Sequence, residues 1–212
     1  MKGMLATVAA IGALVVVSGA LAAMVDGTPG DDRLRGTMQA DVIRALAGND
    51  VVNARDGNDL VRAGAGDDRV HAAGGSDIVF GGTGWDRIHT GSEDDVAWAG
   101  SGDDAIDGGY GPDELHGGSG NDVVRGGPGD DRLWAGPGRD VVHGGAGDDV
   151  LHALAADGDP DVLDCGPGHD TAKVRGSERP TTRFRGCETI VVVVAPTADD
   201  DASEADRDAE AE

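Results

Sequence analysis

A nine-residue repeat is the feature that most constrains this chain. From Gly27 to His152 the sequence divides into fourteen consecutive blocks of nine residues, without insertion or deletion. Position six is Asp in every block, position four is Gly except at Gln39 and Glu93, and position eight is Leu, Ile or Val except at Ala97. Columns that keep their phase over this length predict a short structural unit that stacks on copies of itself.

The repeat places Gly and Asp, residue types that can form a calcium site, at fixed positions in successive blocks. Gly at positions two and four permits positive φ and lets carbonyl groups approach an ion, and Ca²⁺ takes about six to eight hard oxygen ligands. Asp41 is left out of the predicted sites, because Gln39 and Ala40 replace the usual Gly and small polar residue in that block. The predicted metal ligands are the other position-six carboxylates, Asp32, Asp50, Asp59, Asp68, Asp77, Asp86, Asp95, Asp104, Asp113, Asp122, Asp131, Asp140 and Asp149.

The repeat resembles the GGxGxDxUx nonapeptide of the repeats-in-toxin (RTX) family, the hemolysin-type calcium-binding proteins; GGSGNDVVR and GGPGDDRLW are two of its blocks here. The resemblance implies an all-β fold, a right-handed parallel β-roll with calcium as its cofactor. Two blocks make one turn; the first six residues of each form a calcium-binding turn, and the last three form a short strand. The fourteen blocks then give seven turns and a rod roughly 30 Å long, at about 4.8 Å per turn.

Side-chain alternation along each short strand predicts which positions face the interior. Position eight points inward, and positions seven and nine point outward. Ala97 thins the predicted core in the block where Glu93 replaces Gly. We expect that middle block to be a locally weak part of the roll.

Odd and even blocks form opposite sheets if two blocks make one turn, so the two outer faces differ. The face of the odd blocks is basic and carries Arg33, Arg35, Arg69, His71, Arg87, His89, Arg125 and His143. The face of the even blocks is apolar and aromatic and carries Leu60, Ile78, Phe80, Val96, Trp98, His116, Trp134 and His152. The histidines are interpreted as surface sheet positions and not as metal ligands.

The aromatic row at position nine of the even blocks has two open interpretations. In the first, Phe80, Trp98 and Trp134 form a docking face for a glycan, a cell surface or a second copy of the chain. In the second, the row stabilises the sheet through aromatic contacts.

The first residues have the pattern of a secretory signal peptide, predicted to span residues 1–22. Lys2 supplies the positive start, residues 4–17 form an apolar run, and Ala20-Leu21-Ala22 fits a small-x-small cleavage site. The apolar run is short for the alternative, an uncleaved membrane anchor. The pattern therefore predicts a secreted, extracellular protein.

The region after His152 leaves the nine-residue register through a three-residue insertion. Residues 153–195 are predicted to form an altered final turn and a cap, in which Thr189–Val194 is a docked strand and Asp161 and Asp170 continue the repeat. The two cysteines, Cys165 and Cys187, are expected to form a disulfide, as is usual in a secreted chain. Residues 196–212 are predicted to be a disordered acidic tail.

Composition and motifs narrow the function. The net charge is −23, and 40 carboxylates against 17 Lys and Arg argue against nucleic acid as a partner. The sequence has neither an HExxH nor a GxSxG motif, so we do not expect an enzyme. The prediction is a secreted calcium-binding structural or adhesive module that folds on binding calcium. The alternative is a polysaccharide-processing enzyme or glycan-binding protein that uses the aromatic face.

Overall fold

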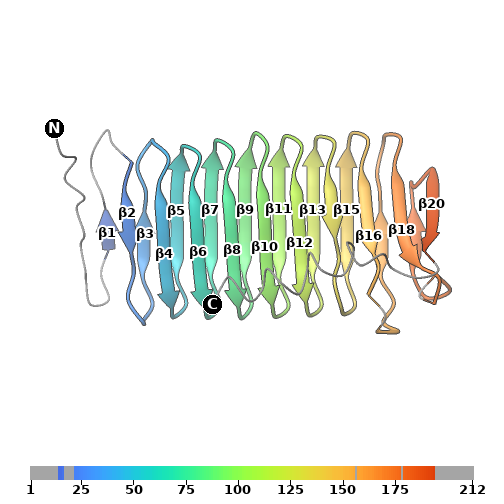
Figure 1. Cartoon of the computed structure of the whole chain (residues 1–212), viewed down its shortest axis with the longest axis horizontal. Coiled ribbons are helices and arrows are strands. Elements are labelled where there is room, and N and C mark those ends of the chain that lie inside the picture. Colours follow the sequence, from blue (N-terminus) through green and yellow to red (C-terminus); the bar gives the residue numbers. More distant parts are fainter. Residues whose placement is uncertain (1–13, 17–21, 156, 178, 194–212) are drawn as a thin grey trace.

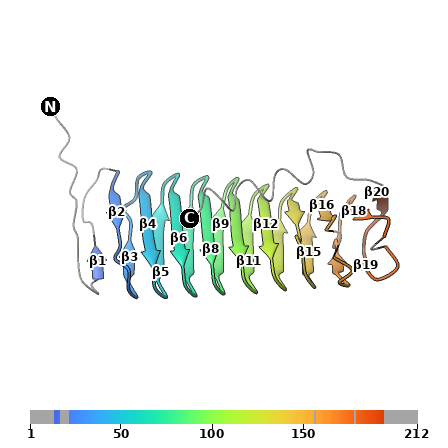
Figure 2. The ribbon, with the colours of Figure 1, turned by 60° about the horizontal axis from the view of Figure 1, so that its bottom comes forward.

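The chain winds into a flat solenoid with two parallel β-sheets, shown in Figure 1 and, turned by 60°, in Figure 2. We describe a computed structural model over residues 14–16, 22–155, 157–177 and 179–193. The chain alternates strictly between the sheets, so odd-numbered strands form one sheet and even-numbered strands form the other. Within the described residues there is no helix, and hence no helix long and apolar enough to cross a membrane.

Each sheet contains ten strands. The odd sheet consists of β1 (Leu14–Val16), β3 (Arg33–Arg35), β5 (Val51–Asp56), β7 (Arg69–Gly74), β9 (Arg87–Ser92), β11 (Ala105–Tyr110), β13 (Val123–Pro128), β15 (Val141–Ala146), β17 (Val162–Asp164) and β19 (Arg183–Arg185). The even sheet consists of β2 (Met24–Asp26), β4 (Val42–Ala47), β6 (Leu60–Ala65), β8 (Ile78–Thr83), β10 (Val96–Ser101), β12 (Glu114–Ser119), β14 (Arg132–Trp134), β16 (Val150–Ala153), β18 (Thr171–Arg175) and β20 (Thr189–Val193).

Strand register confirms that two blocks make one turn. Val52 pairs with Val70 in the odd sheet, and Val61 pairs with Val79 in the even sheet, so each residue lies beside the residue eighteen positions further along. The fourteen blocks supply seven strands to each sheet, β3 to β15 and β4 to β16. The remaining strands come from the chain on both sides of the repeat, so the solenoid is longer than the seven turns expected from the blocks alone.

The strands are also longer than the expected three residues. Most run for six residues, from position seven of one block to position three of the next, as in β5 (Val51–Asp56). The turn between strands is correspondingly reduced to positions four, five and six. Position one of the following block is small, usually Gly or Ala, and this small residue lets the strand continue close to the opposite sheet.

Two inward columns build the core. The predicted column at position eight is confirmed, because its members, such as Ile43, Ile106 and Leu115, are almost completely buried. A second column at position one was not predicted; Ala45, Ala63 and other small residues of that column have no exposed surface. These two columns form a thin core of small and branched side chains. Such a core explains how a chain with only 3% aromatic residues can fold.

A disulfide between Cys165 and Cys187 closes the C-terminal end, as expected. Cys165 occupies position one of its turn and is fully buried, and its N–H donates to Arg185 O. Strand β20 pairs in parallel with β18, so the predicted cap strand is docked along one edge. Its aliphatic side chains nevertheless stay partly exposed, with Val191 and Val192 at 40%.

The predicted terminal segments fall largely outside the described residues. Of the predicted signal peptide, residues 1–22, the structure describes Ala22 and the three residues Leu14–Val16, and these three pair with Arg33–Arg35 as strand β1. The predicted acidic tail, residues 196–212, is not among the described residues.

The middle block contains the expected local irregularity. Glu93 adopts a φ of 78°, a region that costs a side chain with a Cβ about 1–2 kcal/mol. Its carboxylate accepts a hydrogen bond from Gly75 N–H, which offsets part of that cost. Ala97 is buried in the same block, and the inward Thr90 donates a 2.8 Å hydrogen bond to Gly108 O.

Replacing Glu93 with Gly should stabilise the roll by about 1 kcal/mol, because Gly adopts positive φ without the steric cost. Thermal unfolding should report this as an increase of about 2–4 °C in Tm. Glu93→Ala is the matched control, since it loses the same carboxylate and keeps the Cβ. If both variants have the same Tm, backbone strain at this position is not the weakness.

Candidate metal centre

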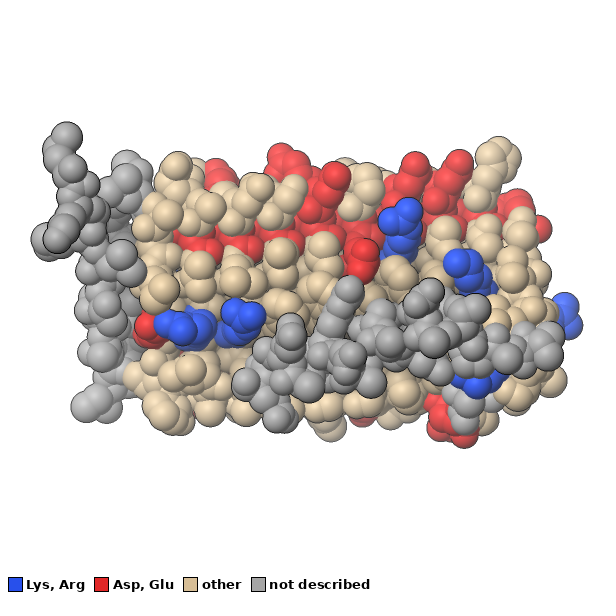
Figure 3. Space-filling view, viewed as in Figure 1, with Lys and Arg blue, Asp and Glu red and all other residues tan. Residues whose placement is uncertain are grey.

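A column of buried carboxylates runs along each edge of the roll. The position-six side chains lie at the end of each turn, directly before a strand, and those of the predicted set are at most 3% exposed. Figure 3 shows acidic side chains gathered in a band along one long edge. The repeat therefore buries the residue type that is most costly to bury without a partner.

From Asp50 onward, one oxygen of each carboxylate binds the neighbouring turn. The backbone N–H of each position-six Asp donates to Oδ1 of the Asp one turn further on; Asp50 N reaches Asp68 Oδ1 at 2.7 Å, and Asp95 N reaches Asp113 Oδ1 at 3.0 Å. We call this chain of bonds the position-six ladder. It continues unbroken through the inserted region, where Asp140 N and Asp149 N donate to Asp161 and Asp170.

Among the described residues, the other carboxylate oxygen has no hydrogen-bond partner in most turns. These Oδ2 atoms are buried and lie inside the turn; they belong to Asp50, Asp59, Asp68, Asp77, Asp86, Asp95, Asp113, Asp122, Asp131, Asp140 and Asp149. A buried carboxylate oxygen without a hydrogen-bond partner is unfavourable unless it binds a proton or a cation. This orphaned oxygen is the first observation that fits a bound metal ion.

Backbone carbonyl groups provide the second observation. A Cβ built on Gly64, at position two, would lie 2.0 Å from Leu46 O of the preceding turn, and one built on Gly66, at position four, would lie 2.2 Å from Gly48 O. Carbonyl oxygens at these positions therefore point along the roll axis into space that a side chain would fill. Carbonyl and carboxylate oxygens together form the ligand set that Ca²⁺ prefers.

The ligands cannot come from side chains alone. Among the described residues, no three His, Cys, Asp or Glu side chains form a cluster that could hold a metal ion. A calcium ion at these turns would therefore need the backbone carbonyls of positions two and four beside the position-six carboxylates.

The first two blocks differ from this arrangement. Thr37 N and Thr37 Oγ1 donate to the Asp41 carboxylate, and Ala23 N donates to it as well, so both Asp41 oxygens have protein partners. Thr28 N and Thr28 Oγ1 likewise donate to Asp32 Oδ2, whereas Asp32 Oδ1 has no partner among the residues that the structure describes. The geometry gives a reason to leave Asp41 out of the predicted ligand set and makes Asp32 the weakest member of that set.

The conformation at position two separates the two classes of turn. Thr28 and Thr37 do not have positive φ, whereas position two has positive φ from Leu46 onward, with values of 84° at Leu46 and 111° at Gly64. A negative φ lets the position-two N–H face the carboxylate, as at Thr28 and Thr37, while positive φ accompanies the orphaned oxygen. In the sequence, Thr in place of Gly at position two could have predicted that the first two turns differ from the others.

Two groups of site residues were not predicted. Glu188 takes the position-six place in the last turn of the even sheet, where its carboxylate accepts Asp170 N–H at 2.9 Å. Asp and Asn side chains at position five form a second ladder. In this ladder the backbone N–H donates to the turn before it and not to the turn after it; Asp67 N, for example, donates to Asn49 Oδ1. The frequency of Asp and Asn at position five could have predicted this second ladder.

Burial, more than any other effect, raises the pKa of the position-six carboxyl groups above the ordinary 3.8. The neighbouring backbone N–H lowers the pKa and the carboxylates of adjacent turns raise it, which leaves a pKa of about 6 at Asp50 and about 8 at Asp77, Asp113 and Asp140. Without a cation, the folded roll therefore takes up protons near neutral pH.

A known family matches most of this chain. The model of the RTX calcium-binding nonapeptide repeat, built of four copies, matches overlapping segments at residues 26–61, 53–84, 80–115, 98–133, 107–142, 116–151, 125–158 and 137–172. These segments together cover residues 26–172, well over half of the chain. No curated protein sequence matches the chain.

Stability of the calcium-free roll should fall as pH rises from about 4 to about 8. The pKa of these carboxyl groups is higher in the folded than in the unfolded chain, so their favourable contribution is complete below pH 3.8 and is lost as pH rises through 6 to 8. Circular dichroism in a calcium chelator at pH 5 and pH 8, with thermal unfolding wherever a folded signal is present, measures this effect.

The control for that measurement is high salt, which screens repulsion between exposed carboxylates and leaves the buried ladder largely unscreened. The pH dependence should therefore persist in high salt. Equal Tm values at both pH values would contradict the assignment of raised pKa values to the ladder.

Proposed function

The chain belongs to the family of the RTX calcium-binding nonapeptide repeat, and from this premise we propose that it is a secreted module that folds on binding calcium. The observation that carries the proposal is the column of buried position-six carboxylates. From Asp50 onward each has one oxygen in the ladder and, in most turns, one oxygen with no hydrogen-bond partner among the described residues. Calcium bound by these oxygens and by the carbonyls of positions two and four would neutralise the column. The proposed ligands remain the thirteen carboxylates predicted from the sequence.

Calcium is proposed here as part of the fold. Adjacent carboxylates repel one another in the folded chain and separate in the unfolded chain, so removing calcium favours unfolding. A ligand that binds only the folded state stabilises it by RT ln(1 + [L]/Kd) at each site, and many weak sites therefore act together. Extracellular calcium modules have Kd values of about 10⁻⁴ to 10⁻³ M, which would keep the chain unfolded at low calcium and fold it outside the cell.

Secretion and a non-catalytic role are parts of the same proposal. The signal-like residues 1–22 support export, and the disulfide between Cys165 and Cys187 suits an oxidising compartment. A structural or adhesive module fits a rod whose interior is filled by side chains. The enzyme alternative has no motif to support it.

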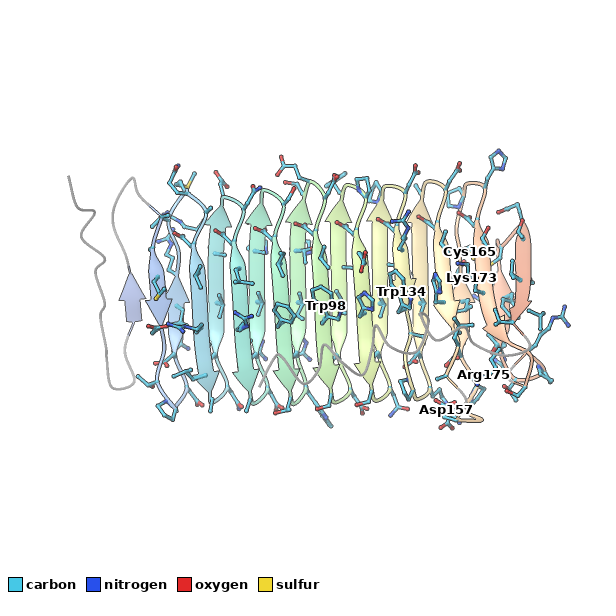
Figure 4. The ribbon with its side chains drawn as sticks, viewed as in Figure 1. Trp98, Trp134, Asp157, Cys165, Lys173 and Arg175 are labelled. Carbon is cyan, nitrogen blue, oxygen red and sulfur yellow. A yellow bond between two sulfur atoms is a disulfide. The ribbon has the colours of Figure 1, made fainter. Side chains whose placement is uncertain are left out.

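The geometry of the aromatic row favours packing over glycan docking. Phe80, Trp98, His116, Trp134 and His152 stack face to face, with ring centroids 4.3–5.3 Å apart and interplanar angles of 10–19°. Figure 4 shows Trp98 and Trp134 in one row along the roll.

Each ring in this row covers the face of the next, so the faces that a sugar would need are already occupied. His116 and His152 are also buried, at 2% and 5% exposure, which corrects their interpretation as surface positions. We therefore propose that the row stabilises the even sheet.

Far-ultraviolet circular dichroism should show folding driven by calcium. In a chelator at pH 8 the chain should lack a β-sheet signal, and calcium should restore it cooperatively at about millimolar concentration. Magnesium at the same concentration is the control, because its small octahedral shell fits a carbonyl cradle poorly. Identical spectra in chelator and in calcium would contradict the proposal.

Counting bound calcium should separate the two classes of carboxylate. Asp113→Asn should lower the number of calcium ions bound per chain in equilibrium dialysis, because the amide keeps an oxygen for Asp95 N–H and places no charge at the orphaned position. Asp41→Asn is the matched control; it loses a bond within block two and should leave the count unchanged. Equal losses in the two variants would contradict the division.

A further inference from the structure

A polar hollow lies at one edge of the odd sheet, where the turns meet strands β7, β9 and β11. Its lining includes two cations, one indole and four hydrogen-bond acceptors, namely Arg69, Arg87, Trp85, Asn49, Asp67, Asp103 and the position-six Asp86. Asp86 is one of the proposed calcium ligands, but position-six calcium ligation does not require the other side chains, and none of those faces the core. The hollow thus needs an explanation of its own.

Trp85 departs from the pattern of its column. It occupies position five, where Asn49 and Asp67 accept a backbone N–H from the next turn. Asp67 Oδ1 accepts Trp85 N–H at 3.0 Å, but an indole has no oxygen with which to continue this ladder. The side chain is 63% exposed, so the position gives up a hydrogen bond and displays a large aromatic ring to solvent. Such local departures mark functional sites.

The face of the Trp85 ring is available to a ligand. Rings of the even sheet cover one another, but no ring contact to Trp85 is formed by any residue that the structure describes. An exposed indole face binds either a cation or the apolar C–H face of a sugar ring. The nearby Arg69 and Arg87 argue against a cationic ligand.

Arg69 and Arg87 stand side by side on adjacent strands. They are direct register partners in β7 and β9, and both are exposed. Like charges opposite each other destabilise a sheet, and within the described part of the chain neither Arg forms an ion pair. Two guanidinium groups so placed can hold one carboxylate through paired hydrogen bonds.

The rim of the hollow restricts the charge of the ligand. Asp67 and Asp103 lie beside the two cations, and they would repel a ligand with several negative charges, such as a phosphate or a densely sulfated polymer. Their oxygens and the Asn49 amide can instead accept hydrogen bonds from hydroxyl groups. The chemistry that matches all of these groups is a ring with an apolar face, several hydroxyls and a single carboxylate.

We propose that this hollow binds a uronic acid residue of an acidic polysaccharide. Trp85 stacks on the sugar ring, Arg69 and Arg87 bind its carboxylate, and Asn49, Asp67 and Asp103 accept hydrogen bonds from its hydroxyls. A second hollow shares Arg69 and Arg87 and continues over the odd sheet to His89, Asp107 and Arg125. Neighbouring sugar units of the same polymer would lie there, with Arg125 placed for a second carboxylate.

The test is binding of oligogalacturonate to the full chain in saturating calcium, measured by titration calorimetry. A neutral oligogalactose of the same length is the control ligand, and sulfated and phosphorylated sugars test the charge class. The wild type should bind oligogalacturonate in preference to all three. Trp85→Asn and Arg69→Gln should each weaken binding about tenfold or more.

Two matched variants keep the result interpretable. Trp85→Asn introduces the residue found at Asn49 and Asn121 of the same column, so the calcium-dependent circular dichroism signal should be retained. Arg132→Gln removes an exposed cation at the same block position of the even sheet, and binding should be unchanged. Circular dichroism thus reports calcium-driven folding, and calorimetry reports sugar binding, so that the two properties are measured separately.

Three outcomes would overturn the proposal. The first is no binding of oligogalacturonate by the wild type. The second is an equal loss of affinity in Arg132→Gln and Arg69→Gln, which would indicate a diffuse charge effect. The third is a sulfated or phosphorylated sugar that binds as tightly as the uronate. Loss of the calcium response in the wild type would instead contradict the proposed calcium-driven folding.

Discussion

The structure depends on a carboxylate that is buried once in every nine residues. From Asp50 onward, each position-six Asp accepts the backbone N–H of the Asp one turn before it, and this bond sets adjacent turns in register. The same bond places like charges in a column away from water, where burial raises their pKa. The hydrogen bond that orders the turns therefore also creates the need for a cation or a proton.

The two ends of the roll differ from the repeated turns in the groups that contact these carboxylates. Thr28 and Thr37 donate to the first two carboxylates from their backbone and hydroxyl groups. At the other end Glu188 replaces Asp, and the disulfide ties the last turns together. The inserted loop before β17 projects beyond the edge of the roll, where Figure 4 labels Asp157, and its Asp157 accepts Gly138 N–H at 2.6 Å. The insertion thus changes the outline of the edge and leaves the position-six ladder intact.

The outer faces show how one stacking rule gives aromatic side chains two different surroundings. At position nine of the even sheet, five successive turns from Phe80 to His152 each place a ring against the ring of the turn before, and the rings stack on one another. At position five of the odd turns, Trp85 lies between Asp67 and Asp103 of adjacent turns and stays exposed. The neighbour eighteen residues away decides whether a ring packs or remains available.

Much of the fold could be predicted from the sequence because its period is regular. The phase of the Asp column, the inward direction of position eight, the division of blocks between two sheets and the pairing of Cys165 with Cys187 all agree with the structure. Each depends on residue type at a fixed place in a repeat, or on there being only two cysteines. The unusual backbone at Glu93 was also visible, because Glu stands at a position where Gly usually provides the positive φ; the weakness of this block stays a prediction.

Residue types along the chain are enough to predict the repeat, its inward column and the carboxylates that could bind a cation. Three features could be seen only in the folded chain: the strands extend through position three, one carboxylate oxygen is bonded and the other orphaned in most turns, and His116 and His152 are buried within a stack of rings. These features arise from contacts between turns. They depend on the rise and register of the solenoid and on the local φ at position two, whereas a repeat pattern reports only which residue types recur along the chain.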